Sequence, residues 1–268
     1  LNELGGAERV LLALSEILPT PPIYTSFYQG GSPSWERFRD KDIRVSWAHY
    51  IPFFSTYLHS PLRFIAPLIW NSFDFSKYDV VIGSAGWYIT KGFRKGKNTI
   101  EICYCHTPPR WLYGYKTSIE WQKYWPIRIY GIIVAHFMRM YDFEAAQKVD
   151  YFIANSKNVA ARIWKFYRKD SKVIYPPVEL PNVGNVEKGD YYLVISRIVG
   201  GKGLELAVAA AQKLGFKLKI AGVPAGYYTE YKKLSEIAGK NVEFLGYVSD
   251  KELAKLYKGA KAFLALAT

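Results

Sequence analysis

The feature that most constrains the fold is a glycine-rich loop at residues 196–203, Ser-Arg-Ile-Val-Gly-Gly-Lys-Gly. The apolar run from Tyr191 to Ile195 before it is typical of a buried parallel strand. The Leu- and Ala-rich residues 204–211 after it predict a helix. Backbone N–H groups at the start of that helix, with Arg197 and Lys202, would attract a diphosphate. An ordinary strand-to-helix turn with solvated charges explains the loop equally well.

Two common phosphate-binding patterns are absent from this loop. Gly201-Lys202-Gly203 lacks the Ser or Thr that holds magnesium in a Walker loop, and the dinucleotide spacing G-x-G-x-x-G does not occur. The loop therefore predicts an anion site made by backbone groups and two cations, without a metal ion.

Segments typical of strands and helices alternate from residue 186 to residue 268. Repeated strand–helix–strand units predict a parallel, doubly wound α/β sheet. A complete doubly wound domain usually has about six strands, so we expect this second domain, 186–268, to be incomplete. The expected strands are 191–196, 217–221, 242–245 and 261–266, and the expected helices are 204–214, 229–238 and 250–258.

The first domain, residues 1–180, is predicted to have the same Rossmann-like organisation, and a Pro-, Gly- and Asn-rich linker follows it. A strand would normally precede Gly5-Gly6 in such a layout, so we expect the first strand to be missing. A long helical pattern at 120–150 has an expected break at Pro126. The expected strands are 23–27, 79–84, 99–105, 151–154 and 173–175, and the other expected helices are 7–18 and 156–167.

The composition excludes several classes of protein. Half of the 268 residues are hydrophobic, which excludes a disordered chain, and no run of 18 apolar residues predicts a membrane span. The net charge of +13 favours an anionic partner: a phosphorylated substrate, an acidic membrane surface or nucleic acid. Cys103 and Cys105 occupy neighbouring same-face positions of a strand, which suit a disulfide poorly, so a reduced cytoplasmic compartment is expected.

Polar and small residues follow several expected strands, at the edge where open α/β sheets bind ligands. His106 precedes Thr107-Pro108-Pro109 on a loop stiffened by prolines, which makes it a candidate site residue. Arg110 on the same loop could hold a phosphate or pair with a surface carboxylate. Asn155-Ser156 is explained by a helix N-cap as well as by a site. The remaining candidates at this edge are Gly5, Gly6, Ser84, Gly222 and Gly246.

Taken together, these stretches resemble the retaining, nucleotide-sugar-dependent glycosyltransferases of group 1, family 4. The resemblance covers essentially the whole chain, and the form of residues 106–110 is most similar to mannosyltransferase-like members. It rests on the order and spacing of Gly5-Gly6-Ala7-Glu8, Cys105-His106-Thr107-Pro108, residues 149–156, residues 173–178, Ser196-Arg197 with Lys202-Gly203, and residues 242–248.

The resemblance implies the GT-B fold, in which two Rossmann-like domains face a cleft, and it implies roles for individual residues. Arg197 and Lys202 resemble the pair that neutralises the donor diphosphate. Gly6, beside Gly5, resembles the loop glycine near the donor phosphate, and His106 resembles the histidine near the anomeric carbon. The walls around ribose and base are expected at Gly222 and at Gly246, Tyr247 and Val248.

The resemblance also implies the chemistry. Such enzymes retain the anomeric configuration, and the leaving diphosphate helps to deprotonate the acceptor, so no protein nucleophile is needed. Stabilisation of the leaving charge would supply most of the catalysis. Neither a cofactor nor a metal ion is expected, since the sequence has no Asp-x-Asp and no His/Cys cluster. The family's acidic pair would lie beyond Thr268, so we expect this chain alone to be an inactive fragment.

The sequence therefore predicts transfer of a hexose, with mannose from GDP-mannose favoured over UDP-sugars. The acceptor would be lipid-linked or a polysaccharide, because the basic, aromatic first domain suits peripheral contact with the inner face of an anionic cell membrane. A nucleotide-sugar epimerase of the same fold remains an alternative, although no carboxylate pair is evident for it. A basic nucleic-acid-binding protein is the other alternative, but the Lys and Arg residues are scattered and no nucleic-acid motif occurs.

Overall fold

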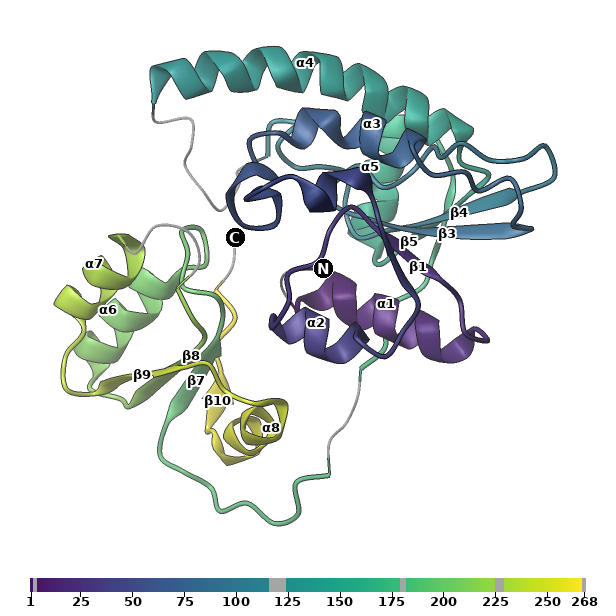
Figure 1. Cartoon of the computed structure of the whole chain (residues 1–268). Helices are drawn as coiled ribbons and strands as arrows, with labels where there is room; N and C mark the ends of the chain where they lie inside the picture. Colours follow the sequence, from purple (N-terminus) through teal and green to yellow (C-terminus); the bar gives the residue numbers. More distant parts are fainter. Residues whose placement is uncertain (2–3, 116–123, 179–181, 225–228, 267–268) are drawn as a thin grey trace. The chain divides into compact units, whose positions relative to one another are not determined.

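The computed structural model describes residues 1, 4–115, 124–178, 182–224 and 229–266. These residues form two compact units (Figure 1), the first extending to Val178 and the second beginning after it. Each unit is an α/β structure built on its own parallel sheet.

The first unit contains a parallel four-stranded sheet in the order β3-β4-β5-β6. Its strands are β3 (Val80–Ala85), β4 (Ile100–Cys105), β5 (Tyr151–Ala154) and β6 (Ser171–Val173). Ala85 is in register with Cys105, and Cys105 with Ala154, so three neighbouring strands end at one level. A separate parallel pair is formed by β1 (Ile23–Thr25) and β2 (Ile43–Val45).

Helices cover this sheet. A buried cluster that includes Cys103, Phe152, Ile163 and Tyr167 joins the strands to α5 (Lys157–Tyr167). The helical pattern expected at 120–150 with a break forms one continuous described helix, α4 (Trp125–Lys148). Pro126 lies in its first turn, where the missing N–H costs nothing, and so it starts the helix instead of breaking it.

Shorter helical segments complete the first unit: α1 (Gly6–Ile17), α2 (Pro33–Phe38), η1 (Trp47–Tyr50), η2 (Phe54–Leu58), η3 (Arg63–Ile65) and α3 (Ala66–Asn71). Aromatic side chains dominate the cluster beneath them, which includes Phe27, Phe54, Trp70 and Phe93. The strand expected at 173–175 lies at Ser171–Val173 instead. Two prolines follow Tyr175, and a proline has no N–H for a sheet hydrogen bond.

The second unit has a parallel sheet in the order β10-β7-β8-β9. Its last described strand lies beside its first, so the order in which strands are added reverses at β7 while all strands stay parallel, as the doubly wound prediction requires. Helices α6 and α7 lie on one face of this sheet and α8 on the other (Figure 1). In chain order the elements are β7 (Tyr192–Ile195), α6 (Leu204–Leu214), β8 (Leu218–Ala221), α7 (Thr229–Ile237), β9 (Val242–Gly246), α8 (Asp250–Gly259) and β10 (Ala262–Phe263).

Candidate active site

His106 lies immediately after β4, at the carboxyl edge of the first unit's sheet, and two neighbouring strands hold it. The hydroxyl of Ser84 on β3 is 2.9 Å from the Nε2 atom of His106. The side-chain amide of Asn155, which follows β5, donates to the His106 carbonyl at 3.0 Å. Because parallel strands bring these residues to one edge, Ser84 and Asn155, which are far apart in sequence, meet at His106, one at its ring and the other at its backbone carbonyl.

The imidazole of His106 is partly buried beside the ring of Tyr104, with 5.2 Å between the ring centroids. Burial lowers the pKa of His106 to about 4, because the charged imidazolium loses solvation. The ring is therefore neutral near pH 7, and one of its nitrogens bonds to Ser84. A neutral imidazole held in this way can donate or accept one further hydrogen bond.

The loop after His106 is anchored to two helices. Arg162 on α5 donates to the hydroxyl of Thr107 at 3.2 Å. Arg139 on α4 donates to the carbonyl of Leu112 at 3.1 Å, and the phenol of Tyr113 donates to Asp142 on α4 at 2.7 Å. The loop is thus a rigid platform, as its prolines suggest.

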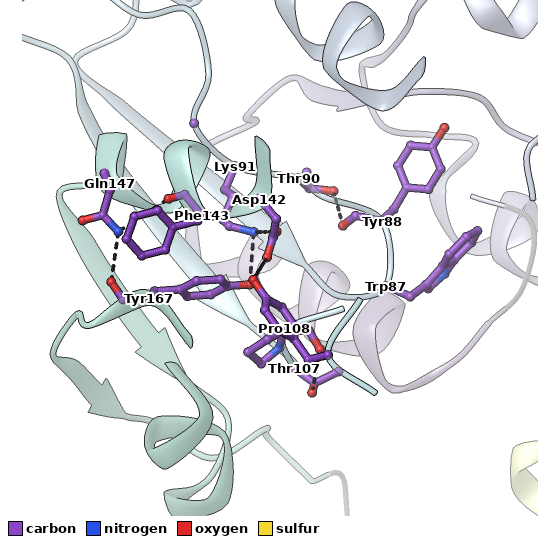
Figure 2. A network of polar contacts seen from close by, with 12 residues as sticks. Trp87, Tyr88, Thr90, Lys91, Thr107, Pro108, Asp142, Phe143, Gln147 and Tyr167 are labelled. Atoms are coloured by element: carbon purple, nitrogen blue, oxygen red, sulfur yellow. Dashed lines mark hydrogen bonds and ion pairs between the residues drawn. The ribbon is translucent and has the colours of Figure 1, made fainter. Parts of the chain in front are cut away.

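A buried network of polar contacts supports this platform (Figure 2). Lys91 forms an ion pair with Asp142, and both side chains are almost completely inaccessible. Tyr167 donates to Asp142 at 2.8 Å, and Lys91 donates to the Tyr167 hydroxyl at 3.3 Å. Burial raises the pKa of Tyr167 well above its ordinary value, which keeps the phenol protonated as a donor.

Sequence reasoning missed Lys91 and Asp142. The only signals were a carboxylate at the end of the helical stripe of aromatic residues and a lysine between Thr90 and Gly92, and each has other charged residues nearby in the sequence. Neither residue identifies its partner, because 51 positions separate them.

The other predicted residues of the first unit are placed near helix starts or on the same loop. Ser156 is the N-cap of α5 and accepts a hydrogen bond from the Val159 N–H at 3.3 Å, so its capping interpretation is confirmed. Arg110 is exposed on the loop after β4. Gly5 is the N-cap of α1 and Gly6 its first residue; both are exposed, and a side chain at Gly6 would meet open space.

In the second unit the glycine-rich loop leads into α6 as predicted. Gly203 is the N-cap of α6, with φ +67°, and no side chain caps the helix. A Cβ atom at Gly203 would lie 2.6 Å from the carbonyl oxygen of Leu266, so only glycine fits. The N-terminus of α6 therefore lacks a side-chain cap, which leaves its N–H groups suited to an anion.

Gly222 follows β8, and its N–H donates to the carbonyl of Gly246 at the end of β9 at 2.8 Å. Its φ is +146°, and a Cβ atom there would lie 2.0 Å from the carbonyl oxygen of Ser196. Gly222 is thus required for the close approach of the chain after β8 to the chain after β7. These two glycines and the loop at 196–203 lie at the carboxyl ends of three adjacent strands.

The charged and aromatic candidates of this unit are more open. Arg197 is exposed and Lys202 is half-buried. In the sequence, Lys202 lies between the buried residues Val199 and Leu204. Within the described ranges, no hydrogen bond or ion pair joins Lys202 to another residue. Tyr247 is exposed, and Val248 is partly buried just before α8.

No group of three or more His, Cys, Asp or Glu side chains among the described residues could hold a metal ion. Among the same residues, no helix has the length and apolar character needed to cross a bilayer.

Comparisons with known proteins agree with this architecture. Residues 4–181 match the family model described as Glycosyltransferase Family 4. Residues 179–268 match the model described as Glycosyl transferases group 1. No curated protein sequence matches the chain.

Solved structures share its fold. Anabaena Alr3699/HepE in complex with UDP is 13% identical, with a TM-score of 0.61, and the match covers 100% of this chain and 73% of that one. WaaG, a glycosyltransferase involved in lipopolysaccharide biosynthesis, is 12% identical, with a TM-score of 0.53, and the match covers 99% and 73%. The chain spans about a third of the length of S. aureus TarM, of which the match covers 32%.

The parallel sheets and these neighbours confirm the predicted α/β fold of the GT-B type. The family 4 model covers well over half of the residues, and the group 1 model covers residues 179–268. The chain belongs to glycosyltransferase family 4.

Proposed function

We propose that this protein transfers a hexose from a nucleotide-sugar donor with retention of anomeric configuration. The observation that carries the proposal is the uncapped N-terminus of α6, with Arg197 and Lys202 on the loop before it. Backbone N–H groups and two cations suit the diphosphate of such a donor. No resident metal ion or cofactor enters this proposal.

In the proposed reaction the glycosidic bond to the donor diphosphate breaks and negative charge builds on the leaving group. Arg197 and Lys202 stabilise that charge, which lowers the barrier more than it strengthens substrate binding. The acceptor oxygen forms a new bond to the anomeric carbon on the face from which the diphosphate departs, and the leaving phosphate accepts the proton of the acceptor hydroxyl. His106, neutral at pH 7, offers a hydrogen bond to the transferred sugar, and Gly6 leaves room for it.

The proposal also specifies the base of the nucleotide donor and the sugar that it carries. We favour GDP-mannose, on the form of residues 106–110, with a UDP-hexose as the alternative. The UDP in the HepE structure supports the alternative. Gly222, Gly246, Tyr247 and Val248 would form the walls around ribose and base in either case.

Calorimetric titration of GDP and UDP into the protein tests the diphosphate site. Arg197→Ala and Lys202→Ala should each weaken nucleotide binding about tenfold or more, because each removes a charge-assisted hydrogen bond. Lys213→Ala is the matched control, since Lys213 is an exposed cation in the last turn of the same helix. Unchanged affinity in both loop variants would show that the diphosphate binds elsewhere.

We also propose that the first unit contacts the cytoplasmic face of an anionic membrane, where a lipid-linked or saccharide acceptor would be reached. The N-terminal half of α4 exposes a large apolar surface, and soluble proteins rarely leave such a surface uncovered. Arg128 and the net charge of +13 add attraction to acidic lipid. The exposed apolar residues are Trp125, Ile127, Ile129, Tyr130, Ile132, Ile133 and Phe137.

Flotation with vesicles tests this contact. The protein should float with vesicles that contain phosphatidylglycerol and much less with pure phosphatidylcholine, because the basic surface adds to apolar insertion. Ile132→Ser combined with Ile133→Ser should reduce flotation several-fold, whereas Leu214→Ser, an exposed apolar residue of the second unit, should not. Equal flotation of all three proteins would argue against α4 as the contact.

A further inference from the structure

A second cationic site lies at the carboxyl edge of the first unit's sheet. The guanidinium carbon of Arg63, on η3, is 5.4 Å from the ring centre of Trp87 and 4.8 Å from that of Trp111. Trp111 donates its indole N–H to the Trp87 carbonyl at 3.0 Å, which locks the two residues together. One arginine is thus held between two indole rings.

Two side-chain hydrogen bonds of Arg63 go to one neighbouring residue, Ser60. Its Nε atom donates to the Ser60 carbonyl at 2.6 Å and its Nη2 atom to the Ser60 hydroxyl at 2.7 Å. Both acceptors are neutral, and no carboxylate of the described residues pairs with Arg63. Burial lowers the pKa of Arg63, as expected for a cation that loses solvation without gaining a counter-charge.

Lys91 provides the contrast within the same unit. It lies four residues after Trp87, and Figure 2 shows it turned toward Asp142, while Trp87 lies apart from that network. Among the described residues, a carboxylate therefore pairs with the buried Lys91, and none pairs with the partly buried Arg63. A partly desolvated guanidinium of this kind interacts favourably with an anionic ligand, which would supply the missing negative charge.

Trp87 and Trp111 lie at the same edge of the sheet as His106. Trp87 follows β3 and Trp111 belongs to the loop after β4, and these two strands end in register at Ala85 and Cys105. Ser84, which bonds to His106, precedes Trp87 by three residues. Trp87 remains 46% exposed, so part of its ring is open to a ligand. An indole face of this kind suits the apolar face of a sugar ring.

We propose that Arg63, Trp87 and Trp111 form an acceptor subsite for a negatively charged saccharide, one whose pyranose ring carries a carboxylate or a phosphate. The sugar ring stacks on Trp87, and its anion takes the guanidinium hydrogens that Ser60 leaves available. The inference rests on the proposed function, because an acceptor is required only if the protein transfers a sugar. It narrows the acceptor to an anionic class.

Saturation-transfer NMR on the whole chain tests the subsite with three probes: glucose, glucuronic acid and glucose 1-phosphate. At least one charged sugar should bind about tenfold tighter than glucose, since a charge-assisted hydrogen bond is added to the same ring contact. The glucuronic acid and phosphate arms distinguish the two sources of charge. Arg63→Met keeps an apolar stem between the rings and should reduce the affinity for the charged sugars to that for glucose.

Lys77→Met is the matched control, because Lys77 is an exposed cation over the ring of Tyr78, before β3, and it should leave the preference intact. Trp87→Ala should weaken all three sugars, and it remains informative if Arg63→Met does not fold. Equal affinity for charged and neutral sugars, no binding of any probe, or a preference that survives in Arg63→Met would overturn the proposal. GDP and UDP titrations of the same samples report separately on the donor site of the second unit.

Discussion

The two units position their candidate site residues in different ways. In the first unit, side chains do the positioning: Ser84 and Asn155 hold His106, and Asp142 supports the loop beyond it. In the second unit, backbone geometry does it: Gly203 starts α6 without a side-chain cap, and Gly222 lets two loops approach closely. The first arrangement fixes the position of one imidazole, that of His106. The second leaves a set of backbone N–H groups at the start of α6 available to a ligand.

This difference indicates how each region would fail. A side-chain network fails when one partner is removed, because the other is left buried and unpaired. A backbone site fails when any Cβ atom is added at a close contact, whatever its chemistry. Three measurements test this contrast.

The largest expected effect is in the first unit. Asp142→Asn keeps the size of the side chain but leaves Lys91 buried without a counter-charge, and it should destabilise the unit by about 4 kcal/mol. Guanidinium denaturation followed by tryptophan fluorescence measures the loss. Lys91→Met combined with Asp142→Asn should recover much of it, because no unpaired charge then remains.

Glu144→Gln is the control for this experiment, since Glu144 is exposed on the same helix and should change stability by no more than about 0.5 kcal/mol. If the double variant were as unstable as Asp142→Asn, the carboxylate would matter to the fold for a reason other than the charge of Lys91.

The next effect is in the second unit. Gly222→Ala brings a Cβ atom to 2.0 Å from the Ser196 carbonyl oxygen and should cost about 3 kcal/mol, because the backbone must shift or strain. Gly201→Ala, at φ +77° with open space around the added atom, should cost only about 1 kcal/mol. Thermal denaturation measures the loss of stability in both variants. Equal losses would mean that the positive φ, and not the close contact, determines the cost of the substitution.

The smallest effect concerns His106 and pH. Its pKa is about 4 in the folded protein and about 6.5 in an unfolded chain, so the unfolded state binds the proton first as the pH falls. Stability is therefore complete above pH 6.5 and falls as the pH decreases to 4, by about 2 kcal/mol once partial exposure of the ring is considered. His106→Asn should lack this part of the pH dependence. Parallel curves for the two proteins from pH 7 to 4 would contradict the burial of a neutral imidazole.

Much of the fold could be predicted because its signals are local. The helix at Leu204–Leu214 follows from its Leu and Ala content and its flanking glycines, β5 follows from a continuous apolar run, and β4 follows from a run that is apolar except at Glu101. Pro126 shows the limit of such signals. A proline can break a helix or begin one, and only its position relative to the first hydrogen-bonded turn decides which.

The candidate site could be predicted to the level of its loops. Strand ends identify His106, Asn155 and Arg197, because parallel strands place their carboxyl ends at one edge. They do not reveal that Asn155 bonds to the His106 backbone, nor that Arg63, from a segment before β3, reaches Trp87 and Trp111. Those contacts join residues that no periodicity relates.

By itself, then, the sequence determined most of the strands and long helices, the doubly wound order of the second unit and the loops that carry candidate residues, since hydrophobic periodicity and glycine placement act over a few residues. It did not predict α2, β2 or α3. Tertiary structure alone decided which charges are paired: Lys91 forms an ion pair with Asp142, whereas Arg63 donates to the neutral carbonyl and hydroxyl of Ser60. The reason is physical. Desolvation and pairing of a charge depend on groups brought together by folding, and the separation of residues along the chain does not predict which groups meet.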